Sequence, residues 1–329
     1  MSTNIESELN EWLEMLRSPD VSDRLVAVKT LQHLGDETAI DALIVALQDE
    51  STAVQKIAVT ALWEIANPAT VPALLPCLAS PDAEVRSEAL SALGELVSSE
   101  DLLLLLDALQ QPDINLQLNV LILLRKIHDA QSLPAVLSFF NSEHPQLREA
   151  AVTTLSYLNQ VQICPPALSL MSDRDDNVRR AAALTLGHLA DAEIVDLLGN
   201  ALTNDTDWQV RRNAAKSLAL YADAKVIPHV LIAVKDEHWQ VRKFAIQVLQ
   251  KIPDAQSLPA LIEALTDEYS DVRKDAAIAL GTALRAIALG NFGKTEAINA
   301  LQQALDDPDR EVSIYAQKAI QKIGEGTRT

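Results

Sequence analysis

The residue types that could ligate a metal or act as nucleophiles are sparse in this chain. It contains two cysteines and six histidines in 329 residues. The histidines are dispersed, at His33, His128, His144, His188, His229 and His238. No Cys-x-x-Cys pair, His-Glu dipeptide or glycine-rich phosphate loop occurs. Metal centres and catalytic sets need several such groups close together. We therefore expect no bound metal or other cofactor, and no catalysis by this chain alone.

The elements that would position any site follow a repeat. Arg or Gln recurs every 31 residues, with a single step of 32, at nine places that we call the ladder positions. They are Arg24, Gln55, Arg86, Gln117, Arg148, Arg179, Arg211, Arg242 and Arg273. Ala or Val follows three residues later, and Leu follows seven residues later. A fixed period of this length indicates stacked repeats rather than one globular core, and so an extended surface rather than a pocket.

Each repeat has the pattern of two helices. Apolar residues are spaced by three or four on two successive segments, and one repeat holds two helices of about 11–12 residues with short turns. An Asp such as Asp82 or Asp113 precedes the first helix as a cap. A Pro such as Pro134 or Pro259 suits the first turn of the second helix. The sequence predicts an all-α, right-handed α-solenoid of about twenty helices, with the second helices on its inner face.

The same register predicts one solenoid over residues 1–329. Residues 5–17 match a lone second helix that caps the first repeat, residues 18–305 hold nine two-helix repeats, and residues 306–329 hold a C-terminal cap helix and tail. The last repeat contains nine extra residues near 281–293, which predict a longer loop or a helix extension on a binding face. Phe292 lies in this insertion.

The repeat motif resembles that of a known family. Asp271-Val272-Arg273, Ala276-Ala277 and Leu280-Gly281 are typical of it, as are Val178-Arg179 and Leu186-Gly187. This pattern resembles the short HEAT-like repeat of the phycobilisome-lyase type, along nearly the whole chain. The resemblance implies the solenoid fold. The family includes bilin-attaching lyase subunits, phycobilisome chaperones, iron-containing hydroxylases and plain adaptors, so the resemblance leaves the function open.

The two cysteines match apolar columns of the repeat. Cys164 corresponds to Val71 and Leu102 in other repeats, and Cys77 corresponds to Ala46. Both are therefore expected to be small buried hydrophobic residues. They are almost three repeats apart, too far for a disulfide, and so few cysteines indicate a reducing cytoplasm.

The net charge of −19 is uneven. Residues 1–160 hold 8 Lys and Arg against 23 Asp and Glu, a net −15, whereas residues 161–329 hold 19 against 23, a net −4. The acidic half should repel nucleic acid and anionic lipid and could attract a partner with a basic region. There is also no leader-like start and no stretch apolar enough for membrane insertion.

The ladder arginines and the residues beside them are the candidate site residues. We expect Arg24, Arg86, Arg148, Arg179, Arg211, Arg242 and Arg273 to bond an Asp or a carbonyl in a neighbouring turn and so to join repeats. The residue after the ladder position is basic in four consecutive repeats, and Trp208 and Trp239 stand three residues before two of these ladder positions. Trp208, Arg212, Trp239 and Lys243, with Phe292, are our predicted partner-binding residues.

These observations favour a non-enzymatic protein-binding scaffold or chaperone-like adaptor. Two alternatives remain, both suggested by the resemblance. The chain could be a bilin lyase or isomerase subunit or another phycobilisome-associated factor, or an accessory protein that binds an A-type iron–sulphur carrier. Local packing of the tryptophans over adjoining turns, without any partner, is also compatible with the sequence.

Overall fold

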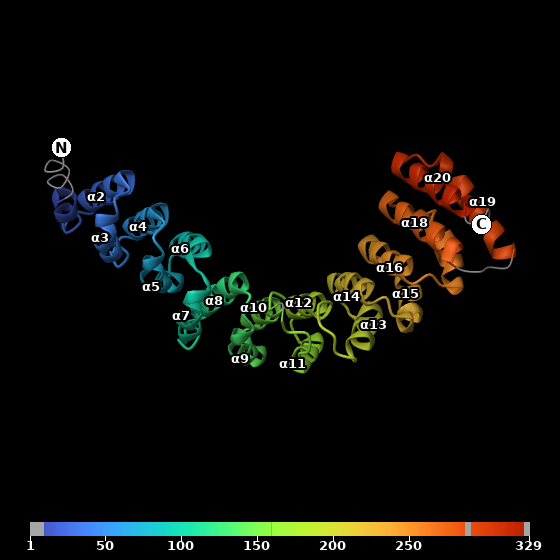
Figure 1. Cartoon of the computed structure of the whole chain (residues 1–329), viewed down its shortest axis with the longest axis horizontal. Helices are drawn as coiled ribbons and strands as arrows, with labels where there is room; N and C mark the ends of the chain where they lie inside the picture. Colours follow the sequence, from blue (N-terminus) through green and yellow to red (C-terminus); the bar gives the residue numbers. More distant parts are fainter. Residues whose placement is uncertain (1–9, 159, 287–290, 326–329) are drawn as a thin grey trace. The chain divides into compact units, whose positions relative to one another are not determined.

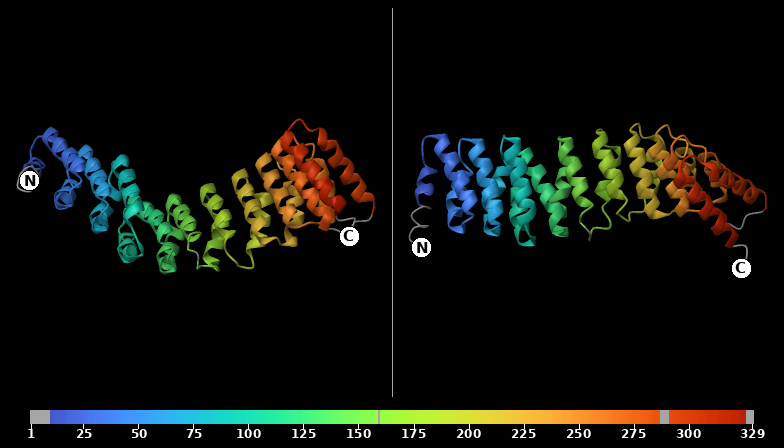
Figure 2. Two further views of the ribbon diagram at one scale, coloured as in Figure 1. Left: turned by 45° about the horizontal axis from the view of Figure 1, so that its top comes forward. Right: turned by 90° about the horizontal axis from the view of Figure 1, so that it is seen from above.

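The computed structural model describes residues 10–158, 160–286 and 291–325, and every regular element there is helical (Figure 1). The chain divides into two compact units, Met1–Gln160 and Val161–Thr329. In each unit a long first helix alternates with a shorter second helix, and successive hairpins stack side by side (Figure 2). The predicted all-α solenoid of helical hairpins is confirmed.

In the first unit, residues 10–15 are helical and precede four complete hairpins and a fifth first helix. The first helices are α2 (Val21–Leu34), α4 (Thr52–Ile65), α6 (Ala83–Leu96), α8 (Ile114–Ile127) and α10 (Pro145–Leu155). The second helices are α3 (Ile40–Ala46), α5 (Val71–Leu74), α7 (Leu102–Ala108) and α9 (Leu133–Ser138). Short 3-10 turns flank the second helices, at η1 (Glu37–Ala39), η2 (Pro68–Thr70), η3 (Leu75–Ala79), η4 (Ser99–Asp101), η5 (Ala130–Ser132) and η6 (Phe139–Asn141).

The second unit follows the same plan and ends on a long first helix. Its first helices are α12 (Asp176–Leu186), α14 (Trp208–Tyr221), α16 (Trp239–Lys251), α18 (Ser270–Ala286) and α20 (Arg310–Glu325). Its second helices are α11 (Pro165–Leu168), α13 (Ile194–Asn204), α15 (Ile227–Ala233), α17 (Leu258–Ala264) and α19 (Asn291–Gln303). The 3-10 turns are η7 (Ser169–Ser172), η8 (Ala224–Val226), η9 (Ala255–Ser257) and η10 (Ala304–Asp306).

The helix boundaries follow from capping chemistry. The Asp82 carboxylate accepts hydrogen bonds from the amides of Glu84 and Val85, which would otherwise lack partners at the start of α6. Before the second helix, Asp223 caps a 3-10 turn rather than an α-turn, and its carboxylate accepts from the amide of Lys225. A Pro follows in the first turn of the second helix, as at Pro228.

The two helices of a repeat are unequal, although the sequence predicted similar lengths. The first helices have 11–17 residues, whereas α5 and α11 have only four. In these second helices the 3-10 turns take up part of the predicted length. In α5 the reason is visible in the sequence, because Pro76 follows Pro72 by one turn, removes another amide donor and turns the segment into η3.

Small residues let successive first helices approach closely. Ala58, Ala89 and Ala182, three residues after their ladder positions, are fully buried. At Gly187, which caps the end of α12, an added Cβ would lie 2.6 Å from Oγ of Ser217 in α14, and at Gly281 it would lie 2.7 Å from Cβ of Ala319. These glycines are therefore required by close packing between neighbouring first helices.

Within the second unit, the first helices line the inner side of the curve and the second helices line its outer side (Figure 1). The sequence-based expectation had placed the second helices inside. The close Ala and Gly contacts give the physical reason, since the layer whose helices approach more closely becomes the shorter, inner one. The exposed face of the first helices is therefore the inner surface of this unit.

The extra residues of the last repeat lengthen its helices. Helix α18 has 17 residues, and α19 has 13 whereas α17 has seven. Residues 287–290, between them, lie outside the described part of the chain. Among the described helices, none combines the length and the apolar character needed to cross a membrane.

Candidate functional site

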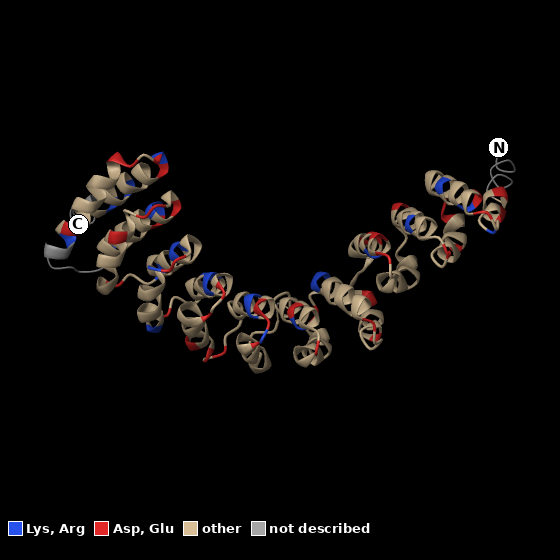
Figure 3. Cartoon of the chain, turned by 180° about the vertical axis from the view of Figure 1, so that it is seen from behind, with Lys and Arg blue, Asp and Glu red and all other residues tan. Residues whose placement is uncertain are grey.

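Ladder arginines form ion pairs with an Asp in the turn before the next first helix. The pairs, with their Nε–Oδ2 distances, are Arg24–Asp49 (2.7 Å), Arg179–Asp205 (2.8 Å), Arg211–Asp236 (2.7 Å), Arg242–Asp267 (2.7 Å) and Arg273–Asp307 (2.7 Å). In each pair a second nitrogen bonds the other carboxylate oxygen. Figure 3 shows the basic residues recurring along the first helices, with acidic residues in the adjoining turns. We call these pairs the Arg–Asp joints.

The aspartate of a joint also accepts a hydrogen bond from the next ladder arginine. The carbonyl of Asp205 accepts from Nη1 of Arg211 at 2.9 Å, and the carbonyl of Asp236 accepts from Nη1 of Arg242 at 2.9 Å. One residue therefore receives the side chains of two consecutive ladder arginines, one through its carboxylate and one through its backbone. Bidentate guanidinium–carboxylate pairs are short, strong and geometrically specific, and the Asp236 carboxylate raises the pKa of Arg211.

Three ladder positions in the first unit lack such a joint. Gln55 donates to the carbonyl of Asp49 at 2.6 Å, Gln117 donates to the carbonyl of Gln111 at 2.9 Å, and Arg86 donates to the carbonyls of Ser80 and Pro81. In the part of the chain that the structure describes, no carboxylate bonds any of these three side chains. Arg86 therefore differs from the paired arginines. Arg148 donates to the carbonyl of Ser142 at 2.7 Å.

The residue directly after the ladder position forms a second column of cations, which we call the basic row: Lys56, Arg180, Arg212, Lys243 and Lys274. Four of its members bond carboxylates of the next repeat. These contacts are Lys56–Glu84 (2.5 Å), Arg180–Asp207 (2.6 Å), Lys243–Asp271 (2.6 Å) and Lys274–Glu311 (2.9 Å). The basic row is therefore largely neutralised within the chain.

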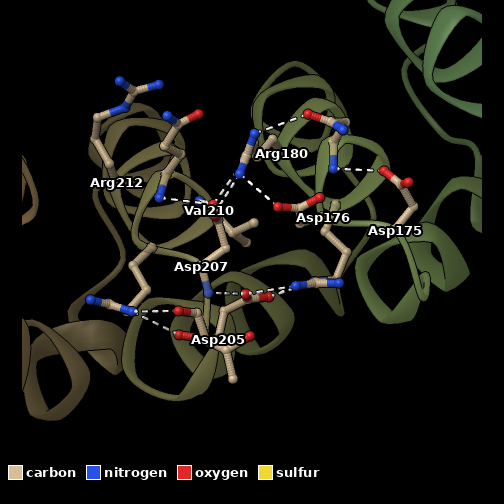
Figure 4. Close-up of polar contacts among 12 residues, drawn as sticks. Asp175, Asp176, Arg180, Asp205, Asp207, Val210 and Arg212 are labelled. Carbon is tan, nitrogen blue, oxygen red and sulfur yellow. Dashed lines mark hydrogen bonds and ion pairs between the residues drawn. The ribbon is translucent and has the colours of Figure 1, made fainter. Parts of the chain in front are cut away.

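Arg180 shows this neutralisation most fully. Its guanidinium lies between Asp176 of its own helix, at 2.7 Å, and Asp207 of the next repeat (Figure 4). The hydrogen bond from Arg180 lowers the pKa of Asp207 to about 2. Asp207 also caps α14, so one carboxylate joins two first helices and begins one of them.

Arg212 is the exception in the basic row. Its Nε and Nη2 both donate to Oδ1 of its neighbour Asn213, at 3.1 and 2.9 Å. Among the described residues, no carboxylate bonds it. Figure 4 shows its side chain pointing away from Asp207 and Asp176. The next repeat has Gln240 two residues before its ladder position, where Glu84, Asp271 and Glu311 stand in other repeats.

The two predicted tryptophans are half-buried and stacked. The ring of Trp208 lies 4.8 Å from that of His238, and the ring of Trp239 lies 5.2 Å from that of Tyr269, with interplanar angles of 22° and 16°. Arg212 lies 5.5 Å from the Trp208 centroid, and Lys243 lies 5.9 Å from the Trp239 centroid. Each tryptophan therefore contacts an aromatic ring of the next repeat and a cation of its own helix.

These stacks were missed in the sequence, although a signal was present. His238 and Tyr269 each follow a tryptophan by 30 residues, so they occupy matching places in successive repeats. The structure brings Trp208 together with Arg212, and Trp239 together with Lys243. The side chain of Phe292, at the start of α19, lies outside the described residues.

The cysteines occupy apolar surroundings. Cys77 and Cys164 are 5% and 3% exposed, and both are free thiols. Burial raises the pKa of Cys77 to about 11 and also raises that of Cys164. Across the described residues, no group of three or more His, Cys, Asp or Glu side chains is arranged to hold a metal ion.

Solved structures share this fold. An engineered protein solved by a structural genomics consortium aligns with a TM-score of 0.55 and 22% identity, over 96% of this chain and 98% of its own. A chain from a structure of Kap95p with RanGDP aligns with a TM-score of 0.62 and 16% identity over 98% of this chain. This chain spans about half of that one, 52%. No curated protein matches.

Family models match most of the sequence. The model described as HEAT repeats matches residues 9–94, 164–234 and 227–285, which together exceed half of the chain. The model described as PBS lyase HEAT-like repeat matches residues 286–307. The chain belongs to the HEAT-repeat family.

Proposed function

We propose that this chain is a non-enzymatic scaffold that binds another protein along the exposed face of its first helices. The observation that carries the proposal is the edge formed by Trp208, Arg212, Trp239 and Lys243. It places two half-buried aromatic rings and two cations in matching positions of adjacent helices, α14 and α16. Trp and Arg supply much of the energy at protein interfaces. Successive helices place such side chains roughly 10 Å apart, within reach of one partner.

The charge distribution supports a division of roles. The first 160 residues carry a net −15, and their exposed carboxylates would attract a basic region of the partner. Such long-range attraction speeds association more than it tightens the complex. The aromatic and basic edge of the second unit would supply the close contacts. The two buried free cysteines suit the reducing cytoplasm, and this location is part of the proposal.

The test begins with capture of partners by the purified full-length chain from its native host. A double Trp208→Ala/Trp239→Ala variant should lose at least about tenfold in affinity for the recovered protein. Trp63→Ala is a matched control, because Trp63 is also half-buried on a first helix but bonds Glu95 in the first unit. Circular dichroism must show that both variants stay folded. Equal affinity of the double variant and the parent would mean that the tryptophans only join repeats.

One observation supports a second candidate, a bilin-handling subunit. Residues 286–307 match the PBS lyase HEAT-like repeat model. The match covers little more than α19 and the turn after it, so it supports this function less than the edge supports the scaffold. Mixing the protein with a linear tetrapyrrole and an apo-phycobiliprotein would test it. A visible absorbance change that needs the chain would favour the lyase, and an unchanged spectrum would leave the scaffold.

A further inference from the structure

Within the described ranges of the chain, the basic row has one place where an acidic partner is missing. Lys56, Arg180, Lys243 and Lys274 each reach a carboxylate of the next repeat, at 2.5–2.9 Å. Arg212 stands in the same column but reaches only the side-chain oxygen of Asn213. Because the fold is repetitive, the other four contacts act as internal references for what a cation at this position normally bonds.

The cause lies in the repeat that follows. This repeat carries Gln240 at the position that is Glu84, Asp271 or Glu311 in other repeats. It also carries His238 at the N-cap of α16, the position that Asp207 occupies before α14. The His238 ring is stacked on Trp208. In other repeats, these two positions supply the carboxylate that bonds the basic row. Here one carries the amide of Gln240 and the other the imidazole of His238.

The guanidinium is nevertheless held in place. Asn213 accepts from Nε and Nη2, and the Trp208 ring lies 5.5 Å from the guanidinium carbon. In addition, Nδ2 of Asn213 donates to the carbonyl of Arg180, which fixes the residue that holds Arg212. A cation ordered before binding loses less conformational entropy when it takes a ligand. Its Nη1 has no hydrogen bond in the described part of the chain.

Further exposed side chains follow Arg212 along α14. Lys216 follows Arg212 by four residues, is exposed and forms no described ion pair. Leu220, another four residues on, is 64% exposed. Residues at this spacing share one helix face. The stripe thus offers one apolar side chain and two cations that have no acidic partner among the described residues.

We propose that Arg212 and Lys216 form an anchor for an acidic segment of a protein partner, whose Asp or Glu carboxylate takes the place of the missing internal one. Leu220 then receives an apolar residue of the same segment. The inference rests on the proposed scaffold function and names the chemistry that this site recognises. A guanidinium presents paired donors that match a carboxylate. A nucleic acid would extend beyond these two cations over the carboxylates that give the chain its net charge of −19, whereas a short acidic segment contacts the two cations alone.

The experiment uses the full-length chain and a random peptide library displayed on phage. Peptides selected on the parent chain should be rich in Asp and Glu with a nearby apolar residue. Resynthesised peptides are then titrated by fluorescence anisotropy against Arg212→Gln and Gln240→Glu. Each variant should weaken binding about tenfold or more, the first by removing the anchor and the second by supplying an internal carboxylate. Lys251→Gln, which removes an exposed cation from the neighbouring α16, should change affinity less than about twofold.

A second measurement, the melting temperature, distinguishes a variant whose anchor is occupied internally from one that is misfolded. Gln240→Glu should leave the melting temperature unchanged or raise it, because it completes the ion pair seen in the other repeats. Failure to select acidic peptides, or equal binding by the parent, Arg212→Gln and Gln240→Glu, overturns the carboxylate assignment. If binding then still depends on Trp208 and Trp239, the scaffold proposal stands and only its partner chemistry falls.

Discussion

Arg211 and Asp236 are joined by two hydrogen bonds, Nε to Oδ2 at 2.7 Å and Nη2 to Oδ1 at 3.1 Å. The same aspartate gives its carbonyl to Arg242, the ladder arginine of the next repeat. Consecutive repeats are therefore joined through a shared residue rather than through independent contacts. In a solenoid, where each repeat packs only on its neighbours, such interface contacts set how cooperatively the repeats unfold.

Arg242→Ala is expected to destabilise the chain more than Arg86→Ala. The first substitution leaves the Asp267 carboxylate, which is 10% exposed, without its cationic partner and should cost about 3 kcal/mol or more. The second removes only bonds to two carbonyls and should cost about 1 kcal/mol. Thermal unfolding measures both, with Lys251→Ala as an exposed control that should be neutral. Equal losses for the two arginines would show that the joints add nothing beyond the carbonyl bonds.

A joint should be transferable to a ladder position that lacks one. Arg24, Arg211 and Arg242 each bond an Asp that lies 25 residues later, the spacing that also separates Gln55 from Ser80. We expect Gln55→Arg combined with Ser80→Asp to be more stable than the sum of the single variants, with a coupling of about 1 kcal/mol. Hydrogen exchange should slow in α4 and η3. Additive single effects would indicate that the geometry at this place differs from that of the other joints.

The Arg180–Asp207 contact predicts a pH dependence. The folded pKa of Asp207 is about 2, below the ordinary value of about 3.9. Its contribution is therefore complete above about pH 5 and is lost as the pH falls from about 4 towards 2. Asp207→Asn keeps a capping side chain and should cost about 1–2 kcal/mol at pH 7. Urea unfolding at stepped pH should show this difference shrinking through that window; a pH-independent cost would contradict the ionic origin.

Asp275 predicts the opposite behaviour. It is 6% exposed on α18, its carboxylate accepts from Gln247 at 2.8 Å, and burial raises its pKa. A raised folded pKa favours folding below the ordinary value, and this contribution is lost as the pH rises through the folded pKa. Asp275→Asn should therefore raise the melting temperature at pH 7, by about 2–4 °C, and have little effect near pH 4. A lower melting temperature at pH 7 would show that the carboxylate is stabilised by Lys243 and Lys274.

The repeat fold was predictable because every level of the pattern agreed. The ladder positions, the buried Leu column and the capping Asp residues all mark the same period, so the fold needs no distant contact to be inferred. The shortness of the second helices was harder to predict. A 3-10 turn and an α-turn share the same Asp and Pro signals, and the choice between them depends on packing.

The candidate site was only partly predictable. Single columns showed that Trp208 and Arg212 are unusual, but contacts between repeats depend on pairs of columns. Gln240 becomes informative only when it is compared with Glu84 and Asp271 as the residue opposite a cation. Likewise, the absence of a joint at Arg86 follows from Gln111, which stands where other repeats place an Asp. Such pairings become visible once the structure shows which positions meet.

Three consecutive ladder positions, Gln55, Arg86 and Gln117, form no joint with any residue that the structure describes, and this has a mechanical consequence. When stacked repeats are bent, the interfaces held by the weakest contacts deform first. Bending of the first unit should therefore concentrate in the segment that these residues span, while the jointed repeats of the second unit keep their own curvature. Bending the solenoid around a partner would therefore need the least elastic energy in this segment.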